Sequence, residues 1–432
     1  MVVGSGASLS GGVVKNILGN VAGPLAGLAS APILAHALGV DGRGEVAAAT
    51  APFLLISTLA TLGIPEAATY FVAKNERVFR TVRARASLVL VLTGILATGL
   101  GLAIAPLLAV DDPNLVTLIM FASLAIVPTV LVGLLRGVAA GLAMWTSVAI
   151  ERALGPMIRL IAIVVLAVTG GLDVVTATIC IVVSPVLGGV IYLVHRSRIK
   201  HSSDSPVPSH VALLNYGSRV WLGSVAGVLL MRIDQVLMVP LSSTYQLGLY
   251  VVAVTISELP LVVNTAVREV MFASDARSTV DSRLTRAARI SLVVCLIVAV
   301  AIAAPSVWWV PLLFGEGFRE AIPTMLILLV GVIAGIPGSI AGSGLSARGL
   351  PQLRSYSLVV AFMVNLIVVL LLVPVWGAAG AALATVLGNV VSSNINVIQM
   401  KRRFGVPFWS FYLIRVQDLR DTFRLVHRVL KR

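Results

Sequence analysis

The chain has 432 residues, of which 58% are hydrophobic and only 12% are charged, and its mean hydropathy is +1.01. A soluble globular domain carries about a quarter charged residues because its surface must be wetted, so this composition excludes an ordinary soluble fold. The formal net charge of +14 is typical of nucleic-acid-binding proteins. Here, however, the basic residues gather in short connections between apolar runs, where membrane topology signals belong. We therefore predict no nucleic acid partner.

Apolar runs of about twenty residues, the length of a bilayer crossing, recur along the whole chain. Backbone amides in hydrocarbon have no water to bond, so each run is expected to be a helix. The twelve predicted spans cover residues 13–38, 45–73, 88–110, 115–135, 145–168, 174–194, 213–240, 247–273, 290–314, 322–345, 356–375 and 378–398. The predicted fold class is therefore all-α integral membrane protein with about twelve transmembrane helices. The first run is interpreted as a membrane helix and not as a cleaved signal.

The charges in the connections predict the orientation. Connections after even-numbered spans are basic, as in the run that holds Lys74, Arg77, Arg80, Arg83 and Arg85. Connections after odd-numbered spans hold Asp41, Asp111, Asp112, Asp173, Glu316 and Glu320 against only Arg43 and Arg319. By the positive-inside rule, both termini face the cytoplasm.

A polar segment near the middle of the chain predicts its division into domains. The expected parts are an N-terminal six-helix bundle (1–195), a cytoplasmic linker (196–212), a C-terminal six-helix bundle (213–400) and a basic cytoplasmic tail (401–432). Apolar residues in 408–432 alternate at spacings of four and three, which predicts an amphipathic helix on the inner membrane face. That helix would serve as a surface anchor or would dock a partner.

Short glycine-bearing turns recur in the two halves, for example at residues 38–47 and 241–251. With six helices in each half, the halves have the same orientation and would be parallel repeats, related by a pseudo-two-fold axis along the membrane normal. Chance similarity between glycine-bearing turns explains these residues equally well.

Several short motifs resemble a known family. They are Ile-Leu-Ala-His-Ala-Leu-Gly at 33–39, Leu-Gly-Ile-Pro-Glu-Ala-Ala at 62–68, Arg-Ile-Asp-Gln at 232–235, Gly-Leu-Tyr at 248–250 and Trp-Gly-Ala-Ala-Gly-Ala-Ala at 376–382. Together they resemble the polysaccharide-transporter branch of the multidrug/oligosaccharidyl-lipid/polysaccharide exporter superfamily. The resemblance implies two six-helix bundles around a central cavity. It also implies export of undecaprenyl-pyrophosphate-linked oligosaccharide units from the inner to the outer leaflet. His36 departs from the family, which often has arginine there, so it inherits no role.

Ionisable residues inside spans are costly and usually face a cavity or a partner. Arg152 and Arg159 are seven residues apart, so they share one face of a helix about 10 Å apart along its axis. Two guanidiniums on one stripe suit a pyrophosphate, since arginine binds phosphate oxygens with two parallel hydrogen bonds. The predicted substrate-binding set is Arg152, Arg159, Arg219 and Arg232. For Arg152 and Arg219, which lie near the cytoplasmic ends of their spans, snorkelling to water is the alternative interpretation.

Two in-span carboxyl groups, Asp234 and Glu258, are the candidate ion-coupling sites for a proton or another cation. Asp234 and Arg232 are two residues apart and point to different faces, so they are not expected to neutralise each other on one helix. A fixed ion pair between helices is the equally weighted alternative for these carboxylates.

Enzyme chemistry finds little support. The five histidines show no metal-ligand spacing, no phosphate-binding glycine-rich loop is present, and no cofactor is predicted.

The alternative functions to polysaccharide export are a multidrug/cation antiporter of the same superfamily, a lipid II flippase and, least favoured, an intramembrane glycan-assembly enzyme. The in-span arginines favour an anionic lipid head group. The predicted protein is an alternating-access flippase of the bacterial plasma membrane, with membrane lipids and polysaccharide polymerase or glycosyltransferases as further partners.

Overall fold

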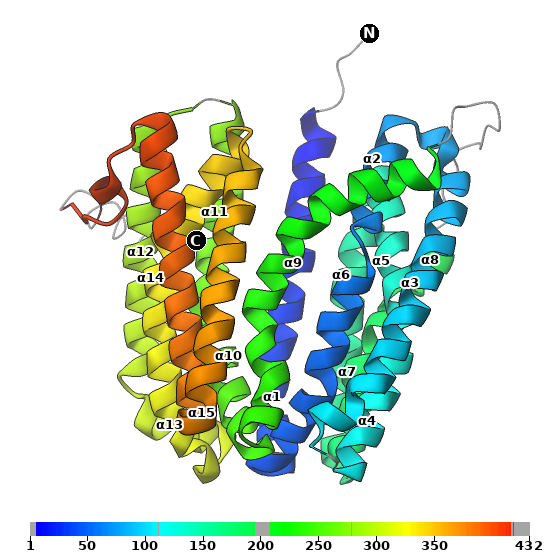
Figure 1. The fold of residues 1–432 in the computed structure, drawn as a ribbon, viewed down its shortest axis with the longest axis vertical. Helices are drawn as coiled ribbons and strands as arrows, with labels where there is room; N and C mark the ends of the chain where they lie inside the picture. The colour runs from blue at the N-terminus through cyan, green and yellow to red at the C-terminus, as the bar shows by residue number, and fades with distance from the viewer. Residues whose placement is uncertain (1–5, 111, 195–207, 278, 416–417, 419–432) are drawn as a thin grey trace. The chain divides into compact units, whose positions relative to one another are not determined.

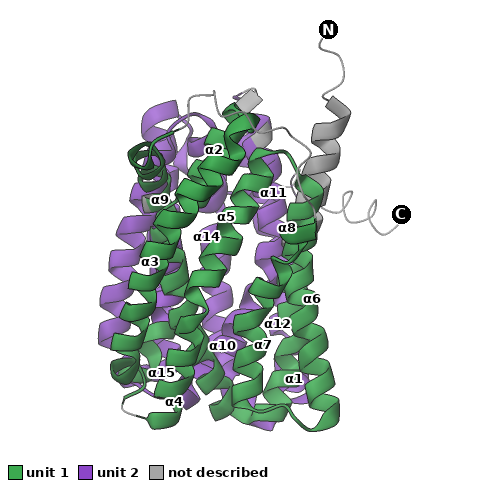
Figure 2. Ribbon diagram, turned by 90° about the vertical axis from the view of Figure 1, so that its right-hand side faces the viewer, with its two compact units in different colours: residues 1–225, 235–240 green, residues 226–234, 241–432 purple. Residues whose placement is uncertain are grey.

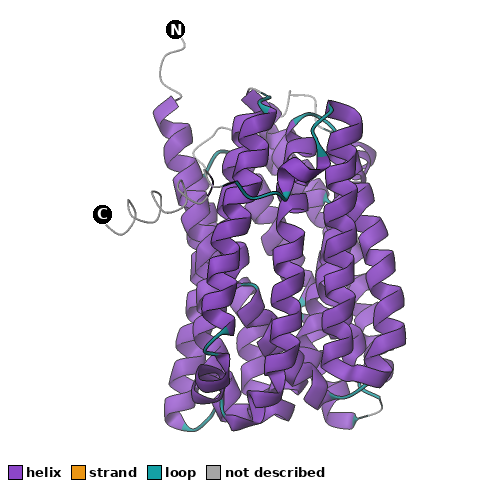
Figure 3. Ribbon diagram, turned by 90° about the vertical axis from the view of Figure 1, so that its left-hand side faces the viewer, coloured by secondary structure: helices purple, strands orange, loops and turns teal. Residues whose placement is uncertain are grey.

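The computed structural model describes residues 6–110, 112–194, 208–277, 279–415 and 418, with side chains from residue 22 onward except at 222, 273, 276 and 277. Over these residues the ordered elements are α-helices and short 3-10 helices, and no strand occurs among them (Figures 1 and 3). Nine helices in this part of the chain are long and apolar enough to cross a membrane, and a tenth span results if one bent pair is counted together. The prediction of an all-α, multi-pass membrane protein is confirmed.

Two of the nine helices are hairpins, which explains the difference from twelve predicted spans. Helix α15 (Pro351–Phe404) holds Ser357 and Ser392, whose hydroxyl oxygens are 3.4 Å apart. A straight helix would separate these residues by about 50 Å, so α15 must fold back on itself, and its backbone breaks at Gly377. Helix α1 (Gly6–Ala60) breaks at Gly39, and its Leu34 and Val46 share one apolar cluster. Counting each hairpin as two spans restores the predicted number.

Gly39 changes the interpretation of the residues that follow it. The sequence predicts an outer connection at residues 39–44, but the helix resumes at Val40 and already contains Arg43. Gly39 has φ 67° and ψ −170°, a conformation that side chains other than glycine rarely adopt. Because this single residue breaks the helix, no loop is needed. Arg43 therefore belongs to a helix and not to a loop.

The chain forms two compact units, which Figure 2 shows in different colours. Unit 1 comprises residues 1–225 and 235–240, and unit 2 comprises 226–234 and 241–432. The other elements of unit 1 are α2 (Ile64–Lys74), η1 (Glu76–Val78), α3 (Phe79–Leu108), α4 (Pro113–Leu124), α5 (Ile126–Gly141), α6 (Trp145–Thr169), α7 (Val174–Gly188) and α8 (Ile191–Val194). Helix α9 (His210–Leu241) contributes residues to both units. The predicted domain boundaries at 195, 212 and 400 stay a prediction.

Unit 2 continues with α10 (Thr244–Ser257), α11 (Leu259–Arg277), α12 (Asp281–Ala303), α13 (Ser306–Phe314), η2 (Glu316–Glu320), α14 (Ala321–Ala347), α15 and η3 (Phe408–Phe411). Helices α10 and α11 together form the predicted eighth span and are bent by 45° at their junction. The predicted ninth span, 290–314, is divided into α12 and α13, which are separated by Ala304 and Pro305. Proline lacks the amide proton that would continue the helix, which accounts for this break.

Backbone-to-backbone packing joins α9 to the α1–α2 junction inside unit 1. A Cβ atom on Gly63 would lie 2.2 Å from the carbonyl oxygen of Gly217, and one on Gly217 would lie 2.6 Å from that of Leu62. The indole nitrogen of Trp221 donates to the carbonyl of Leu59 over 3.1 Å. Glycine at both positions allows this approach, which any larger residue would prevent.

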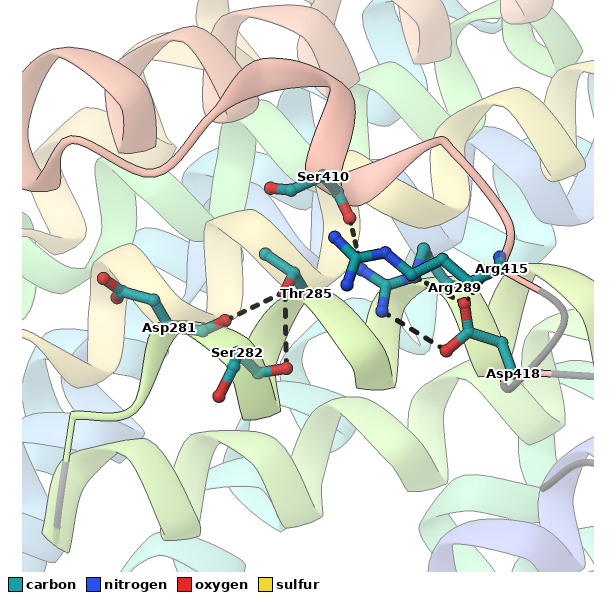
Figure 4. Close-up of polar contacts among 7 residues, drawn as sticks. All are labelled: Asp281, Ser282, Thr285, Arg289, Ser410, Arg415 and Asp418. Carbon is teal, nitrogen blue, oxygen red and sulfur yellow. Dashed lines mark hydrogen bonds and ion pairs between the residues drawn. The ribbon is translucent and has the colours of Figure 1, made fainter.

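A C-terminal strap follows α15 in unit 2. We use this name for the described residues 405–415 and 418. The Arg289 guanidinium on α12 donates to both carboxylate oxygens of Asp418, at 2.7 and 3.3 Å, and to the carbonyl of Ser410 at 2.7 Å (Figure 4). Phe411 is fully buried in a cluster with Leu284 and Met400. The strap is therefore held by an ion pair and by apolar packing.

The strap differs from the predicted amphipathic helix. Residues 408–411 form a 3-10 turn and Leu413–Arg415 are not helical, because Phe411 and Tyr412 turn inward, and the Tyr412 hydroxyl donates to Asn394 over 3.0 Å. Most of the remaining predicted helix, at 416–417 and 419–432, lies outside the described residues.

Breaking the strap's ion pair should destabilise the protein. Burial opposes ionisation of Asp418, but the hydrogen bonds from Arg289 and from the Arg415 amide outweigh burial and lower the pKa of this carboxyl. Asp418→Asn leaves Arg289, whose side chain is 5% exposed, without its counter-ion and should cost about 3 kcal/mol of unfolding free energy. Thermal unfolding in detergent measures this loss.

The matched control is Glu316→Gln, which breaks an exposed ion pair with Arg319 and should leave the melting temperature unchanged. The Asp418 contribution is fully present above the unfolded carboxyl's pKa of about 4 and is lost as pH falls through the lower folded value. Equal melting temperatures for wild type and Asp418→Asn at pH 7 would contradict this account.

Candidate functional site

A pair of arginines forms the first candidate site, inside unit 1. Arg43 on the second half of α1 and Arg159 on α6 are half-buried and close enough to repel each other. The Nε atom of each is buried and has no hydrogen-bond partner. No carboxylate forms an ion pair with either guanidinium in the described part of the chain. Two like charges held together without a counter-ion are costly, and an anion placed between them would remove that cost.

Gly27 makes room for this pair. It lies on the first half of α1, and a Cβ atom built there would be 3.6 Å from Nη2 of Arg159. The hairpin at Gly39 thus brings both halves of α1 to the same arginine on α6. The arrangement can bind an anion with two neighbouring guanidiniums, each offering several N–H donors.

The N-terminal half of α6 carries a different network. Glu151 is 4% exposed and accepts two hydrogen bonds from Arg136 on α5, at 2.8 and 2.9 Å. The hydroxyl of Tyr192 approaches the same carboxylate at 3.4 Å. The predicted substrate residue Arg152 is half-buried on this helix and interacts electrostatically with Tyr192. The pairing of Glu151 with Arg136 is a structural bridge between α5 and α6.

A buried carboxylate forms the second candidate site, inside unit 2. Asp234 on α9 is 2% exposed. Its Oδ2 atom accepts a hydrogen bond from the hydroxyl of Tyr250 on α10 and another, at 3.1 Å, from Thr385 on α15. The Tyr250 and Thr385 hydroxyl oxygens are themselves 3.1 Å apart. Three oxygen-bearing side chains from three helices therefore converge at one buried point.

An unsatisfied amide lies in the same unit, about one helical turn away along α9 and α15. Asn365 on α15 is fully buried, and neither atom of its amide group has a hydrogen-bond partner. It packs against Gly388, which also packs against Leu230. Gly388 lies one helical turn after Thr385, and Leu230 lies one turn before Asp234. A buried amide without a partner is uncommon, and an ion or water would supply one.

The other predicted site residues of unit 2, Arg232 and Glu258, lie near Asp234. Glu258 caps α10 at the bend, is exposed, and lies within electrostatic range of both Arg232 and Asp234. Arg232 is half-buried on α9. The structure therefore brings Arg232, Asp234 and Glu258 together in one unit. Arg219, in unit 1, is an exposed residue of α9.

Sequence reasoning missed several members of these sites. Arg43 was assigned to a loop, and the hydroxyl partners of Asp234 are 16 and 151 residues away from it. A tyrosine inside an apolar run is one signal that a polar partner is needed, because its hydroxyl seldom stays unpaired when buried. Asn365 gave a similar signal in the predicted eleventh span. Among the described residues, no group of three His, Cys, Asp or Glu side chains has the geometry to bind a metal ion.

Solved structures share this fold over most of the chain. The lipid II flippase MurJ, in an inward closed conformation, is 14% identical with a TM-score of 0.73, covering 96% of this chain and 93% of that one. An inward-facing multidrug resistance MATE family transporter of the MOP superfamily is 16% identical with a TM-score of 0.65, covering 90% and 98%. A MOP superfamily transporter from Pyrococcus furiosus is 14% identical with a TM-score of 0.61, covering 91% and 94%. These likenesses establish the fold of a MOP superfamily transporter.

Sequence comparison adds the family. None of the curated proteins matches this chain. The family model described as "Polysaccharide biosynthesis protein" matches residues 10–272, a stretch that includes both arginines of the first site and Asp234, Tyr250 and Glu258 of the second. Since this match spans more than half of a chain that has the helical transporter fold, the protein belongs to the polysaccharide biosynthesis protein family.

Proposed function

We propose that this protein is a flippase that moves undecaprenyl-pyrophosphate-linked oligosaccharide from the inner to the outer leaflet of a bacterial plasma membrane. It works by alternating access, and both termini face the cytoplasm. The observation that carries this proposal is the pair Arg43 and Arg159, with two buried Nε atoms that have no partner. A transporter of organic cations gains nothing from two neighbouring guanidiniums, whereas a pyrophosphate is stabilised by both.

The physical argument rests on charge. A pyrophosphate head group loses its hydration when it enters the membrane interior, which is unfavourable unless cationic donors replace the water. Arg43 and Arg159 carry an uncompensated charge of the opposite sign at that point, so the desolvation costs of protein and substrate are offset together. Arg152 and Arg232 extend the proposed contacts, while the exposed Arg219 is the weakest member of the predicted set.

The proposed energy source is an ion gradient acting at Asp234. The carboxylate, two hydroxyls and the unsatisfied Asn365 amide supply the hard oxygen ligands that a small cation prefers, and the same carboxylate can bind a proton instead. Glu258, exposed at the α10–α11 bend, is the second proposed coupling residue. Polysaccharide polymerase or glycosyltransferases are the proposed partners that supply the substrate and consume the product.

Three other functions compete with this one. A multidrug/cation antiporter would need a carboxylate-lined site, and an intramembrane glycan-assembly enzyme would need catalytic side chains near a sugar. A lipid II flippase would use the same arginines, because lipid II also carries a pyrophosphate. The family match at residues 10–272 favours polysaccharide export over lipid II.

Transport by the purified protein in proteoliposomes tests the proposal. Three substrates are compared under one ion gradient: a fluorescent undecaprenyl-pyrophosphate oligosaccharide, fluorescent lipid II and ethidium. We expect the oligosaccharide lipid to reach the opposite leaflet fastest, and ethidium not to accumulate. Accumulation of ethidium without movement of either lipid would overturn the proposal in favour of the antiporter. If lipid II moves faster than the oligosaccharide lipid, lipid II is the substrate and the proposed substrate is wrong.

A further inference from the structure

A cavity of about 510 Å³ lies in unit 1, apart from the arginine pair. The first turns of α3 contribute Phe79, Arg80 and Arg83 to its wall. The opposite walls come from the C-terminal part of α5 and from α8, and they include Val138, Leu142 and Tyr192. A volume of this size accommodates a small-molecule head group.

The cavity carries an uncompensated positive charge. Arg80 and Arg83 are exposed and lie about one helical turn apart at the N-terminal end of α3. Neither forms an ion pair with a carboxylate in the described part of the chain. The first turn of α3 contains no acidic residue, and Glu76 in η1, directly before α3, forms no ion pair with either arginine. The N-terminus of a helix is itself partly positive. Cations placed there raise the electrostatic energy, and a bound anion lowers it.

The nearest network cannot supply that anion. Tyr192 in the cavity wall contacts the Glu151 carboxylate at 3.4 Å, but Glu151 is already bound by Arg136 through two hydrogen bonds of 2.8 and 2.9 Å. Arg348 in unit 2 differs from Arg80 and Arg83, because its charge is balanced by ion pairs with both Asp275 and Asp281. Arg80 lies over the Phe79 ring, with its guanidinium carbon 5.7 Å from the ring centroid. Neither this contact nor the network around Glu151 supplies a negative charge, so both cavity arginines can bind an anionic ligand from outside the chain.

The remaining wall is apolar. Leu135, Val138, Leu142 and Met144 line the cavity opposite the arginines. Arg80 and Arg83 belong to the connection at 74–87, which is the most basic one between predicted spans. The positive-inside rule therefore assigns this connection to the cytoplasmic surface of the membrane. Anionic lipids are attracted to basic residues at that surface. A ligand with one phosphate close to its acyl chains matches both walls.

We infer that this cavity binds the head group of an anionic phospholipid such as phosphatidylglycerol from the cytoplasmic leaflet. Arg80 and Arg83 hold the phosphate, and the leucine and methionine side chains contact the glycerol and the start of the acyl chains. The bound lipid neutralises the N-terminus of α3 and joins α3 to α5 and α8. This inference does not depend on the transported substrate, since it uses none of the residues proposed to contact it.

Lipid titration of the delipidated full-length protein in detergent tests the inference. Native mass spectrometry counts bound short-chain phosphatidylglycerol, and thermal unfolding follows the stabilisation. Wild type is expected to bind one tighter lipid and to melt at a higher temperature with phosphatidylglycerol than with phosphatidylcholine. Arg80→Gln/Arg83→Gln should weaken the binding of that lipid by about tenfold or more. Ala139→Phe, which fills the cavity without changing charge, should weaken it as well.

The matched control is Arg402→Gln/Arg403→Gln, which removes two exposed positive charges from the last turn of α15 and should leave the tighter lipid in place. Equal binding by wild type and Arg80→Gln/Arg83→Gln would overturn the inference, and so would an equal loss in the control. If inorganic phosphate at the same concentration stabilises wild type as much as phosphatidylglycerol does, the site binds phosphate alone and the lipid is not its ligand.

Discussion

Replacing Arg159 by methionine should strongly reduce transport of the lipid-linked oligosaccharide without destabilising the protein. The guanidinium is half-buried beside Arg43 and its Nε atom has no partner. Its removal should therefore leave the unfolding free energy unchanged or raise it by about 1 kcal/mol. The substrate loses hydrogen bonds between charged groups, which should reduce transport by roughly tenfold to a hundredfold. Proteoliposome transport and the melting temperature in detergent measure the two effects.

Two controls make this prediction specific. Arg159→Lys keeps the charge and loses the planar fork, so it should restore transport in part. Arg136→Met removes an arginine from the same unit that is paired with the buried Glu151. It should lower stability by about 2 kcal/mol, a value discounted because the Arg136 side chain is 37% exposed. If Arg159→Met is destabilised as much as Arg136→Met and transports normally, Arg159 is a structural residue.

Asp234→Asn should reduce transport driven by an ion gradient by about tenfold or more, while the protein still binds the lipid-linked substrate. The carboxylate accepts hydrogen bonds from Tyr250 and Thr385, and an amide of nearly the same shape has only one acceptor oxygen and cannot bind a proton or balance a cation. Transport rates measured over a range of pH and of sodium concentration then identify the coupling ion.

Glu258→Gln tests the second proposed coupling residue, which is exposed whereas Asp234 is 2% exposed. We expect the glutamine variant to keep part of its gradient-dependent transport. Tyr250→Phe removes one donor to the Asp234 carboxylate and should weaken coupling less than Asp234→Asn does. Normal transport by Asp234→Asn at every pH and sodium concentration would exclude this residue as the coupling site. A marked loss of folded protein in that variant would instead indicate a structural role.

Much of the membrane architecture was predictable from the sequence because a bilayer imposes local requirements. A span needs about twenty apolar residues and must satisfy its own backbone hydrogen bonds, so the run lengths already predicted helices and their approximate number. The cost of a charge in hydrocarbon likewise marked Arg159, Arg232, Asp234 and Glu258 as unusual before any neighbour was known.

The partners of those residues were decided only by the tertiary structure. Gly39 breaks α1 at a single residue with φ 67°, which moved Arg43 from a predicted loop into a helix beside Arg159. Asp234 meets Thr385 across 151 residues, and Arg289 meets Asp418 across 129. Hydropathy and charge patterns in a sequence indicate whether a residue lies in a membrane span and at which depth, but they do not identify its partners on other helices. Which side chains face each other across two helices depends on crossing geometry and on close backbone contacts such as Gly63 against Gly217, and these arise only when the helices pack.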